Sequence, residues 1–303
     1  MSPKALRYIL IAILTVAAVG VALYMLGMFN SDIDSSLDQG YPATSTDLTQ
    51  SSSTKIVESE VVGVSVKGRP IEAFTYGDGS RHLLFVGGIH GGYEWNSILL
   101  AYNMMDYLQA NPTEIPADIM MTIIPSANPD GLHDMIEQEG RFRAIEVPAD
   151  IDYDGTGRFN ANNVDLNRNF DCNWAPESTW RGQTVSAGSG AFSEPESQAI
   201  RDFVQSHNIT AAVFWHSQAN AVYASECNSG VLPETLEVMN TYAAAANYNA
   251  VASFDAYPIT GDVEGWLASI GIPAVTVELE TRNSIEWERN LRGVKELLNL
   301  YAR

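Results

Sequence analysis

Two histidines and one glutamate have the types and positions expected of metal ligands. His90 follows the apolar run HLLFVGGI, His216 ends the run AAVFWH, and Glu94 comes four residues after His90 at the start of a helical pattern. Strand ends of this kind meet at the edge of an α/β sheet where ligands bind. Two histidines and one carboxylate make an open catalytic zinc site with a water in the fourth position. On their own, His90 and Glu94 also fit ordinary polar loop residues, because short motifs match by chance.

Further motifs follow in a defined order and favour the metal site. They are RFNANNVDLNRNF at 158–170, FSEPE at 192–196, HSQ at 216–218, YPITG at 257–261 and VTVEL at 275–279. Together with the segment around His90, this order resembles the zinc carboxypeptidase family, typified by the pancreatic carboxypeptidases, over most of residues 60–300. The resemblance implies one Zn²⁺ per chain and hydrolysis of the peptide bond that precedes a free C-terminal residue.

The resemblance assigns roles to the residues nearest the metal. His90, Glu94 and His216 match the three zinc ligands, and Asp165 matches the carboxylate that accepts a hydrogen bond from His90 and fixes its tautomer. Glu278 matches the general base that takes a proton from the zinc-bound water and hands it to the leaving amine. The alternative for Glu278 is a strand-end residue that reaches solvent.

An arginine is implied beside the reacting carbonyl. Arg158 matches the family's oxyanion-stabilising arginine, whose fixed charge offsets the negative oxygen of the tetrahedral intermediate. Arg141 and Arg143 are rival candidates, because the spacing in this stretch is not standard.

Four residues match groups that bind the substrate. Asn167 and Arg168 match the pair that holds the terminal carboxylate, a task suited to a planar guanidinium. Tyr257 matches the mobile tyrosine that closes over the same end, although a tyrosine before Pro258 also suits a packed loop. Counting forward from Tyr257 places Glu264 at the base of the side-chain pocket, where the basic-specific branch of the family has an acid. Glu264 therefore either favours a terminal Lys, Arg or diaminopimelate, or is a solvated residue at an acidic helix start.

Two local features depart from a simple match. The family usually spaces its first two ligands as HxxE, whereas HGGYE here has one extra residue, which the two glycines allow as a wider turn. The chain has two cysteines, Cys172 and Cys227, each a short way beyond a presumed site element. They form a bridge that braces the crevice in an extracytoplasmic domain, or separate thiols in a cytoplasmic one.

The elements that must position these residues follow an α/β pattern. Short apolar or β-branched runs alternate with segments whose apolar residues recur every three or four positions. The fold class expected is a mixed central sheet with helices on both faces. The predicted strands are 61–66, 71–76, 82–87, 120–125, 211–215 and 275–279, and the predicted helices are 95–108, 193–206, 262–269 and 284–298.

The N-terminal part has a different composition. Residues 8–29 carry no charge and follow Lys4 and Arg7, which predicts a cytoplasmic N-terminus at 1–7, a transmembrane signal anchor at 8–29 and an extracytoplasmic remainder. Secretion after signal cleavage is the alternative. Residues 30–55 are rich in Ser, Thr and Asp and read as a flexible linker, which leaves 56–303 as one catalytic domain.

The charge of the chain narrows the possible partners. Its 17 basic and 37 acidic residues give a net charge of −20, which repels phosphate backbones and excludes nucleic acid as an expected partner. The sequence thus predicts a membrane-tethered zinc carboxypeptidase that acts on peptides or cell-wall stem peptides with a free C-terminal carboxylate. The alternatives are a murein-peptide amidase of the same family, a zinc deacylase resembling aspartoacylase, and a non-catalytic module that binds peptide C-termini.

Overall fold

The computed structural model describes residues 56–254 and 258–302. The predicted anchor at 8–29, the predicted linker at 30–55 and Tyr257 lie outside this part. Within it, no helix combines the length and the apolar character needed to cross a bilayer.

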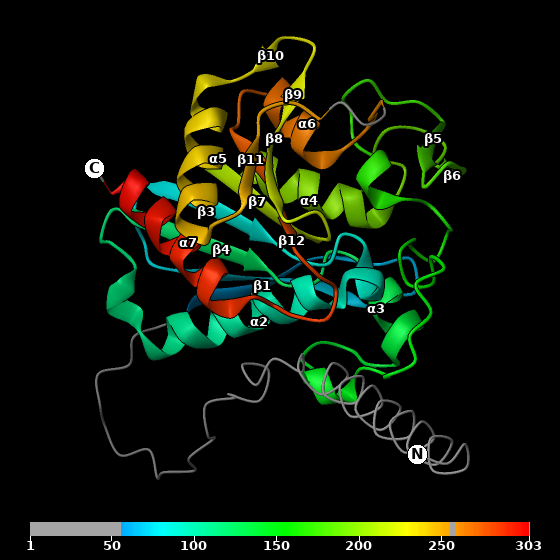
Figure 1. Ribbon diagram of the computed structural model, residues 1–303, viewed down its shortest axis with the longest axis horizontal. Helices are drawn as coiled ribbons and strands as arrows, with labels where there is room; N and C mark the ends of the chain where they lie inside the picture. Colours follow the sequence, from blue (N-terminus) through cyan, green and yellow to red (C-terminus); the bar gives the residue numbers. More distant parts are fainter. Residues whose placement is uncertain (1–55, 255–257, 303) are drawn as a thin grey trace, which may run out of the picture. The chain divides into compact units, whose positions relative to one another are not determined.

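A mixed eight-stranded sheet forms the centre of the domain (Figure 1). The strand order is β1-β2-β4-β3-β7-β12-β8-β11. The four central strands β4, β3, β7 and β12 run parallel, whereas β1, β2 and β8 are antiparallel to their inner neighbours and β11 is parallel to β8. The bounds are β1 Ile56–Val64, β2 Pro70–Tyr76, β3 Arg81–Val86, β4 Ile119–Ile124, β7 Ile209–Ser217, β8 Ala221–Ala224, β11 Asn249–Val251 and β12 Ala274–Leu279.

Helices cover both faces, and the alternation of side chains along the central strands explains the division. Phe214 of β7 belongs to a buried cluster that includes residues of α4 (Pro195–Ser206) and α6 (Val263–Ser269). The next residue, Trp215, points the other way and donates a hydrogen bond from Nε1 to the Tyr242 hydroxyl of α5 (Pro233–Ala246) at 3.1 Å.

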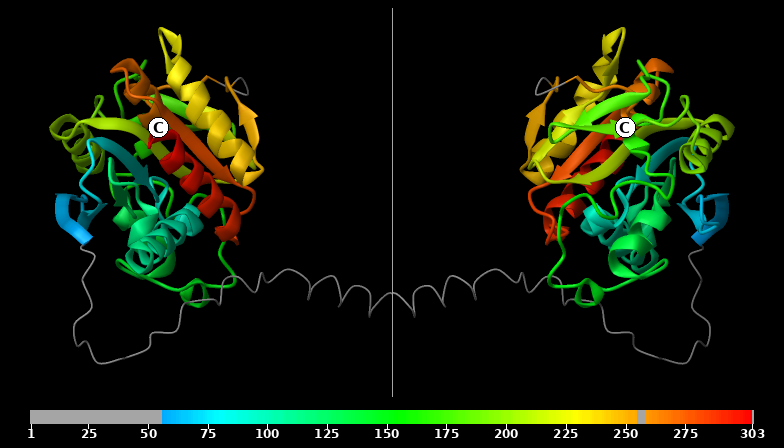
Figure 2. Two further views of the ribbon diagram at one scale, coloured as in Figure 1. Left: turned by 90° about the vertical axis from the view of Figure 1, so that its left-hand side faces the viewer. Right: turned by 90° about the vertical axis from the view of Figure 1, so that its right-hand side faces the viewer.

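Two more helices lie on the α5 side of the sheet. Helix α7 (Trp287–Tyr301) packs along α5, and Figure 2 shows this pair from two directions. Helix α2 (Trp95–Ala110) contacts α7 through the rings of Tyr107 and Trp287.

The segment between 140 and 190 is mostly irregular, as its composition predicts. It contains two short 3₁₀ turns and one small hairpin. The remaining elements of the domain are η2 Gly91–Glu94, η3 Pro112–Glu114, α3 Pro129–Ile136, η4 Ala144–Glu146, η5 Leu166–Arg168, β5 Glu177–Trp180, β6 Gln183–Ser186, β9 Glu226–Cys227 and β10 Gly230–Val231.

The predicted fold class is confirmed for the described residues, with shifts at several element ends. The strand expected to end at Trp215 continues to Ser217, so His216 lies within β7 and not after it. The first strand ends at Val64 and the last helix begins at Trp287, against predictions of 66 and 284. Strands β8 to β11 were not predicted, since runs of two to four residues carry too little periodicity.

Candidate zinc site

The register between two parallel strands brings one predicted ligand beside the predicted base. β7 and β12 pair His216 with Glu278, and they pair Phe214 with Thr276 two residues earlier. Residues two apart on a strand share a face. His216 and Glu278 therefore project from the face that α4 and α6 cover, at the carboxyl end of both strands.

A glycine turn at the end of β3 supplies the other two ligands. His90 precedes η2, and Glu94 is the last residue of η2, directly before α2. A Cβ on Gly91 would lie 2.5 Å from the Gly157 carbonyl oxygen, and one on Gly92 would lie 2.4 Å from Met135 Cβ. The two glycines thus let the wider HGGYE turn pack against α3, and the extra residue leaves Glu94 beside His90.

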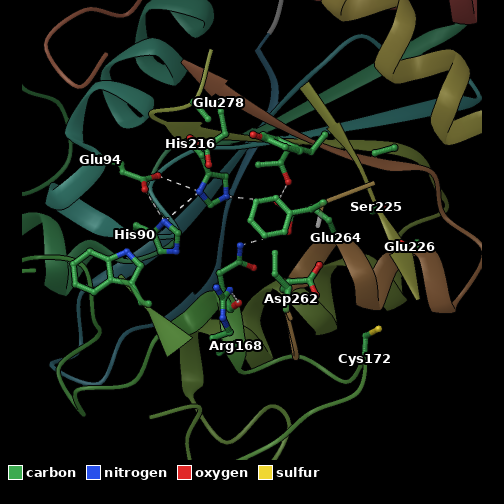
Figure 3. A pocket seen from close by; sticks show the side chains of 18 of the residues that line it. His90, Glu94, Arg168, Cys172, His216, Ser225, Glu226, Asp262, Glu264 and Glu278 are labelled. Atoms are coloured by element: carbon green, nitrogen blue, oxygen red, sulfur yellow. Dashed lines mark hydrogen bonds and ion pairs between the residues drawn. The ribbon is translucent and has the colours of Figure 1, made fainter. Parts of the chain in front are cut away.

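The three predicted ligands converge on one point (Figure 3). Glu94 Oε1 lies 2.8 Å from His90 Nδ1, and Glu94 Oε2 lies 3.1 Å from His216 Nδ1. The two Nδ1 atoms are 3.2 Å apart. All three residues are buried, and among the described residues they form the one group of three or more potential ligands close enough to hold a metal ion.

Arginine 158 lies beside these ligands, and its rivals do not. Arg158 Nη1 is 3.8 Å from Glu94 Oε1, and Arg158 Nη2 donates to Asp165 Oδ2 at 2.8 Å. The guanidinium stacks on the Trp180 ring with 4.7 Å between Cζ and the ring centroid, which fixes its direction. The guanidinium groups of Arg141 and Arg143 instead form ion pairs with Asp106 and Glu146 in exposed positions.

The buried carboxylates of the site stabilise positive charge beside them. Burial opposes ionisation of Glu94, but His90 and His216 hold its pKa well below the usual range. Burial also disfavours the charged form of His216, yet Glu94 and Glu264 raise its pKa to about 10. A site that keeps a proton on a buried histidine is built to hold a cation, and a metal ion is the alternative to that proton.

Glu278 has the properties of a group that exchanges a proton near neutral pH. Its Oε2 is buried and has no hydrogen-bond partner among the described residues. Burial and the charge of Glu94 raise the pKa of Glu278 to about 7, against the opposing effects of His216 and Arg158. A carboxylate with such a pKa beside a metal site suits general base chemistry.

A comparison with family models decides the relationship. A model described as zinc carboxypeptidase matches residues 44–288. The chain belongs to the zinc carboxypeptidase family. Its donor set fits this family's single zinc ion, because two histidines and one glutamate are a known catalytic zinc set and their ligand atoms lie within 4.8 Å of one another.

Two curated relatives illustrate the range of the family. The γ-D-glutamyl-L-diamino acid endopeptidase 1 of Lysinibacillus sphaericus is 26% identical over 239 residues, covering 72% of this chain and 59% of that protein. Carboxypeptidase B of Helicoverpa zea is 26% identical over 243 residues, covering 71% and 56%. The chain thus spans less than two thirds of the length of these relatives.

Solved structures share the fold. Murein-tripeptide amidase MpaA from Escherichia coli O157 has a TM-score of 0.59 at 22% identity and covers 84% of this chain and 98% of its own. Carboxypeptidase A from Helicoverpa armigera has a TM-score of 0.64 at 22% identity and covers 81% and 68%.

A cavity of about 640 Å³ extends from the zinc site of this family member toward α6. Arg168 also lines it (Figure 3), donating from Nη1 to the Asn167 carbonyl at 2.5 Å and from Nε to Ser178 Oγ at 3.2 Å. Asn167 Oδ1 accepts the backbone N–H of Val263, so this side chain ties η5 to the start of α6. The cavity therefore holds the metal ligands and, besides Arg158, the further guanidinium of Arg168.

The cavity wall includes a disulfide. Cys172 and Cys227 form a bond across 55 residues of sequence, and both line the cavity. This bond joins the loop after η5 to β9, so it links two walls that are distant along the chain.

Sequence reasoning missed three residues that line or support the site. Trp180 and Arg282 stand in segments without a recognisable pattern, and only the tertiary structure brings them to the cavity. Asp262 was expected only as an acidic residue at a helix start, and it both caps α6 through the Gly265 N–H and lines the cavity. Tyr257 lies outside the described residues.

Proposed function

We propose that this protein is a zinc-dependent carboxypeptidase that removes the last residue of a peptide with a free C-terminal carboxylate. One observation carries the proposal. The His90, Glu94 and His216 ligand set lines the same cavity as Arg168 and Glu278, whose buried Oε2 has no hydrogen-bond partner among the described residues.

The residues divide the work of amide hydrolysis. Zinc, when bound, supplies Lewis acid chemistry that polarises the scissile carbonyl and acidifies a water. Glu278 takes the proton of the attacking water and transfers it to the nitrogen of the leaving amine. Arg158, held by Asp165 and Trp180, places a fixed positive charge where negative charge develops on the carbonyl oxygen.

Arg168 and the acidic residues that line the cavity select the substrate. Arg168 binds the terminal carboxylate of the peptide, which places the last peptide bond at the metal. Asp262, Glu264 and Glu226 line the same cavity and make it acidic. This surrounding favours a positively charged terminal side chain, namely Lys, Arg or the ammonium group of diaminopimelate.

A murein-peptide amidase is the second candidate. The name of the Lysinibacillus sphaericus relative describes cleavage between γ-D-glutamate and a diamino acid, and an acidic cavity suits the second amino group of such a residue. A deacylase and a non-catalytic peptide-binding module remain as outcomes of the same test.

The test is product analysis by mass spectrometry on the zinc-loaded full chain, with and without a chelator. Free-ended peptides that terminate in Lys, Arg, Leu or Phe are compared with muropeptides and with N-acylated amino acids. Chelator-sensitive release of single C-terminal residues, fastest for Lys and Arg, is expected. Cleavage of muropeptides alone selects the amidase, cleavage of acylated amino acids alone selects the deacylase, and binding without cleavage selects the module.

We also propose that residues 8–29 anchor the protein in a membrane, with 30–55 as a tether and the catalytic domain outside the cytoplasm. An uncharged segment of this length spans a hydrocarbon core, and the preceding Lys4 and Arg7 favour a cytoplasmic N-terminus. The full chain should stay in the membrane pellet after alkaline extraction. Release of a shortened chain into the medium would show signal cleavage instead.

A further inference from the structure

The carboxylate of Glu264 is engaged by groups of the protein itself. Oε1 accepts a hydrogen bond from Thr276 Oγ1 at 2.9 Å and lies 3.5 Å from His216 Nε2. Oε2 lies 3.5 Å from Asn167 Nδ2, which is a donor. Glu264 is 2% exposed, so the side chain has little freedom to turn toward a ligand in the cavity.

The two histidines of the site have matching surroundings. His90 turns Nδ1 toward Glu94 and has Asp165 Oδ1 3.5 Å from Nε2, while His216 turns Nδ1 toward Glu94 and has Glu264 Oε1 3.5 Å from Nε2. Neither Nε2 has a hydrogen-bond partner among the described residues, and both are buried. At 3.5 Å, a carboxylate oxygen is thus available as an acceptor for each Nε2–H.

We infer that Glu264 is a positioning residue for His216, accepting its Nε2–H so that Nδ1 is unprotonated and aimed at the metal. A carboxylate behind a ligating histidine fixes the tautomer and the ring direction and makes the ligand more basic. Asp165 stands in the same relation to His90, so each ligating imidazole has one carboxylate oxygen 3.5 Å from its Nε2.

With Glu264 orienting His216, a different acid of the cavity must bind a positively charged substrate group. Asp262 is two residues earlier at the start of α6, is only partly buried and lines the cavity. It is therefore the carboxylate of this pair available to a substrate cation. The inference rests on the proposed zinc enzyme and deepens it, because the resemblance to the family offered substrate specificity as one of two roles for Glu264.

Zinc affinity of the full chain tests the inference without any substrate. Competition with a chromophoric chelator measures the zinc Kd of the unchanged chain, of Glu264→Gln and of the matched control Asp262→Asn, whose asparagine still caps α6. Glu264→Gln should weaken zinc binding about 10- to 100-fold, the usual effect of losing such an outer partner. Asp262→Asn should leave the zinc Kd within about twofold and reduce the preference for Lys over Leu ends.

A second variant covers the case in which Glu264→Gln does not fold. Thr276→Val removes the hydroxyl that holds Glu264 Oε1, and it should weaken zinc binding in the same direction by a smaller factor. Thermal unfolding of the metal-free chains separates folding defects from loss of metal affinity. An unchanged zinc Kd in folded Glu264→Gln, with loss of the Lys preference, overturns the inference and returns Glu264 to substrate selection. Absence of peptidase activity defeats the proposed function but leaves the zinc Kd comparison intact.

Discussion

Replacing Glu278 with glutamine tests two properties of this carboxylate separately, namely its effect on the stability of the fold and its role in catalysis. The glutamine amide has nearly the same shape but cannot ionise. Because Oε2 of Glu278 is buried without a hydrogen-bond partner among the described residues, the charged form is disfavoured in the folded chain. The variant should therefore be more stable and less active than the unchanged protein.

The size of the stability effect follows from the pKa of Glu278. Burial and Glu94 raise it from 4.5 to about 7 in the metal-free protein. Below pH 4.5 the carboxyl is protonated in both the folded and the unfolded chain, so Glu278 adds no penalty there. Between pH 4.5 and 7 the unfolded chain loses its proton first, and the folded state pays a penalty that is complete above pH 7. The shift corresponds to about 3 kcal/mol.

Urea unfolding of the metal-free chains at two pH values measures this penalty. At about pH 8, Glu278→Gln should raise the free energy of unfolding by up to about 3 kcal/mol, and at about pH 4.5 the gain should vanish. Glu280→Gln is the matched control, since Glu280 is two residues away with a side chain that is 57% exposed, and it should show no such pH-dependent gain.

Kinetics of the zinc-loaded chains complete the experiment. Loss of a general base should reduce kcat about 10²- to 10⁴-fold while zinc stays bound. The acid limb of kcat/KM in the unchanged enzyme should lie at or below pH 7, because a bound cation favours the ionised form of Glu278. A Glu278→Gln chain that is no more stable at pH 8 refutes the buried-carboxylate reasoning, and near-normal activity refutes the assignment of the base.

Three further predictions test substrate binding, acid sensitivity and the disulfide. Arg168→Gln should raise KM about 10- to 100-fold with a smaller change in kcat, since a hydrogen bond to a charged group contributes about 1.5–3 kcal/mol. The control Arg201→Gln on α4 should change neither constant. Steady-state kinetics on free-ended peptides measure both variants, and an unchanged KM for Arg168→Gln contradicts its role in binding the terminal carboxylate. Burial, with a smaller contribution from the charge of His207, lowers the pKa of His82 to about 4. Between about pH 4 and 6.5 the unfolded chain therefore binds more protons than the folded chain, so the free energy of unfolding falls as the pH is lowered. His82→Gln should remove up to about 1.4 kcal/mol per pH unit from that slope in urea titrations, and an unaltered slope rules His82 out as its source. Replacing both Cys172 and Cys227 with alanine should lower the free energy of unfolding by about 4 kcal/mol, which is the chain-entropy value for a loop of 55 residues. Guanidinium unfolding measures this loss. An unchanged free energy of unfolding would show that the unfolded chain restricts this loop even without the disulfide.

Much of the fold and the metal site follows from local sequence. The central strands are apolar runs that alternate with helical patterns, and this alternation predicts a mixed α/β sheet with helices on both faces without any tertiary information. The same runs point to the ligands, because His90 follows β3 after a short glycine turn and His216 is the penultimate residue of β7. The order of the motifs adds the identity of the family.

The short strands at one edge and the exact element ends could not be predicted in this way. β8 and β11 are short, and they exist because they extend the sheet beyond β12. Their stability comes from pairing with a neighbour that is distant in sequence, which no local pattern reports.

The site shows the same division between local and tertiary information. Residue types and their places near strand ends are written in the sequence, so a ligand set and a candidate base could be predicted from it. Three arginines remained open for the oxyanion role, and only the tertiary structure shows that Arg158, packed against Trp180 and Asp165, lies beside the predicted ligands. For Glu264, the sequence determined a carboxylate near the pocket, whereas the packing of α6 against β7 and β12 placed its oxygen 3.5 Å from His216 Nε2. The physical reason is that residue type and local periodicity are properties of a short segment, but a contact between helix and strand depends on burial summed over the whole core.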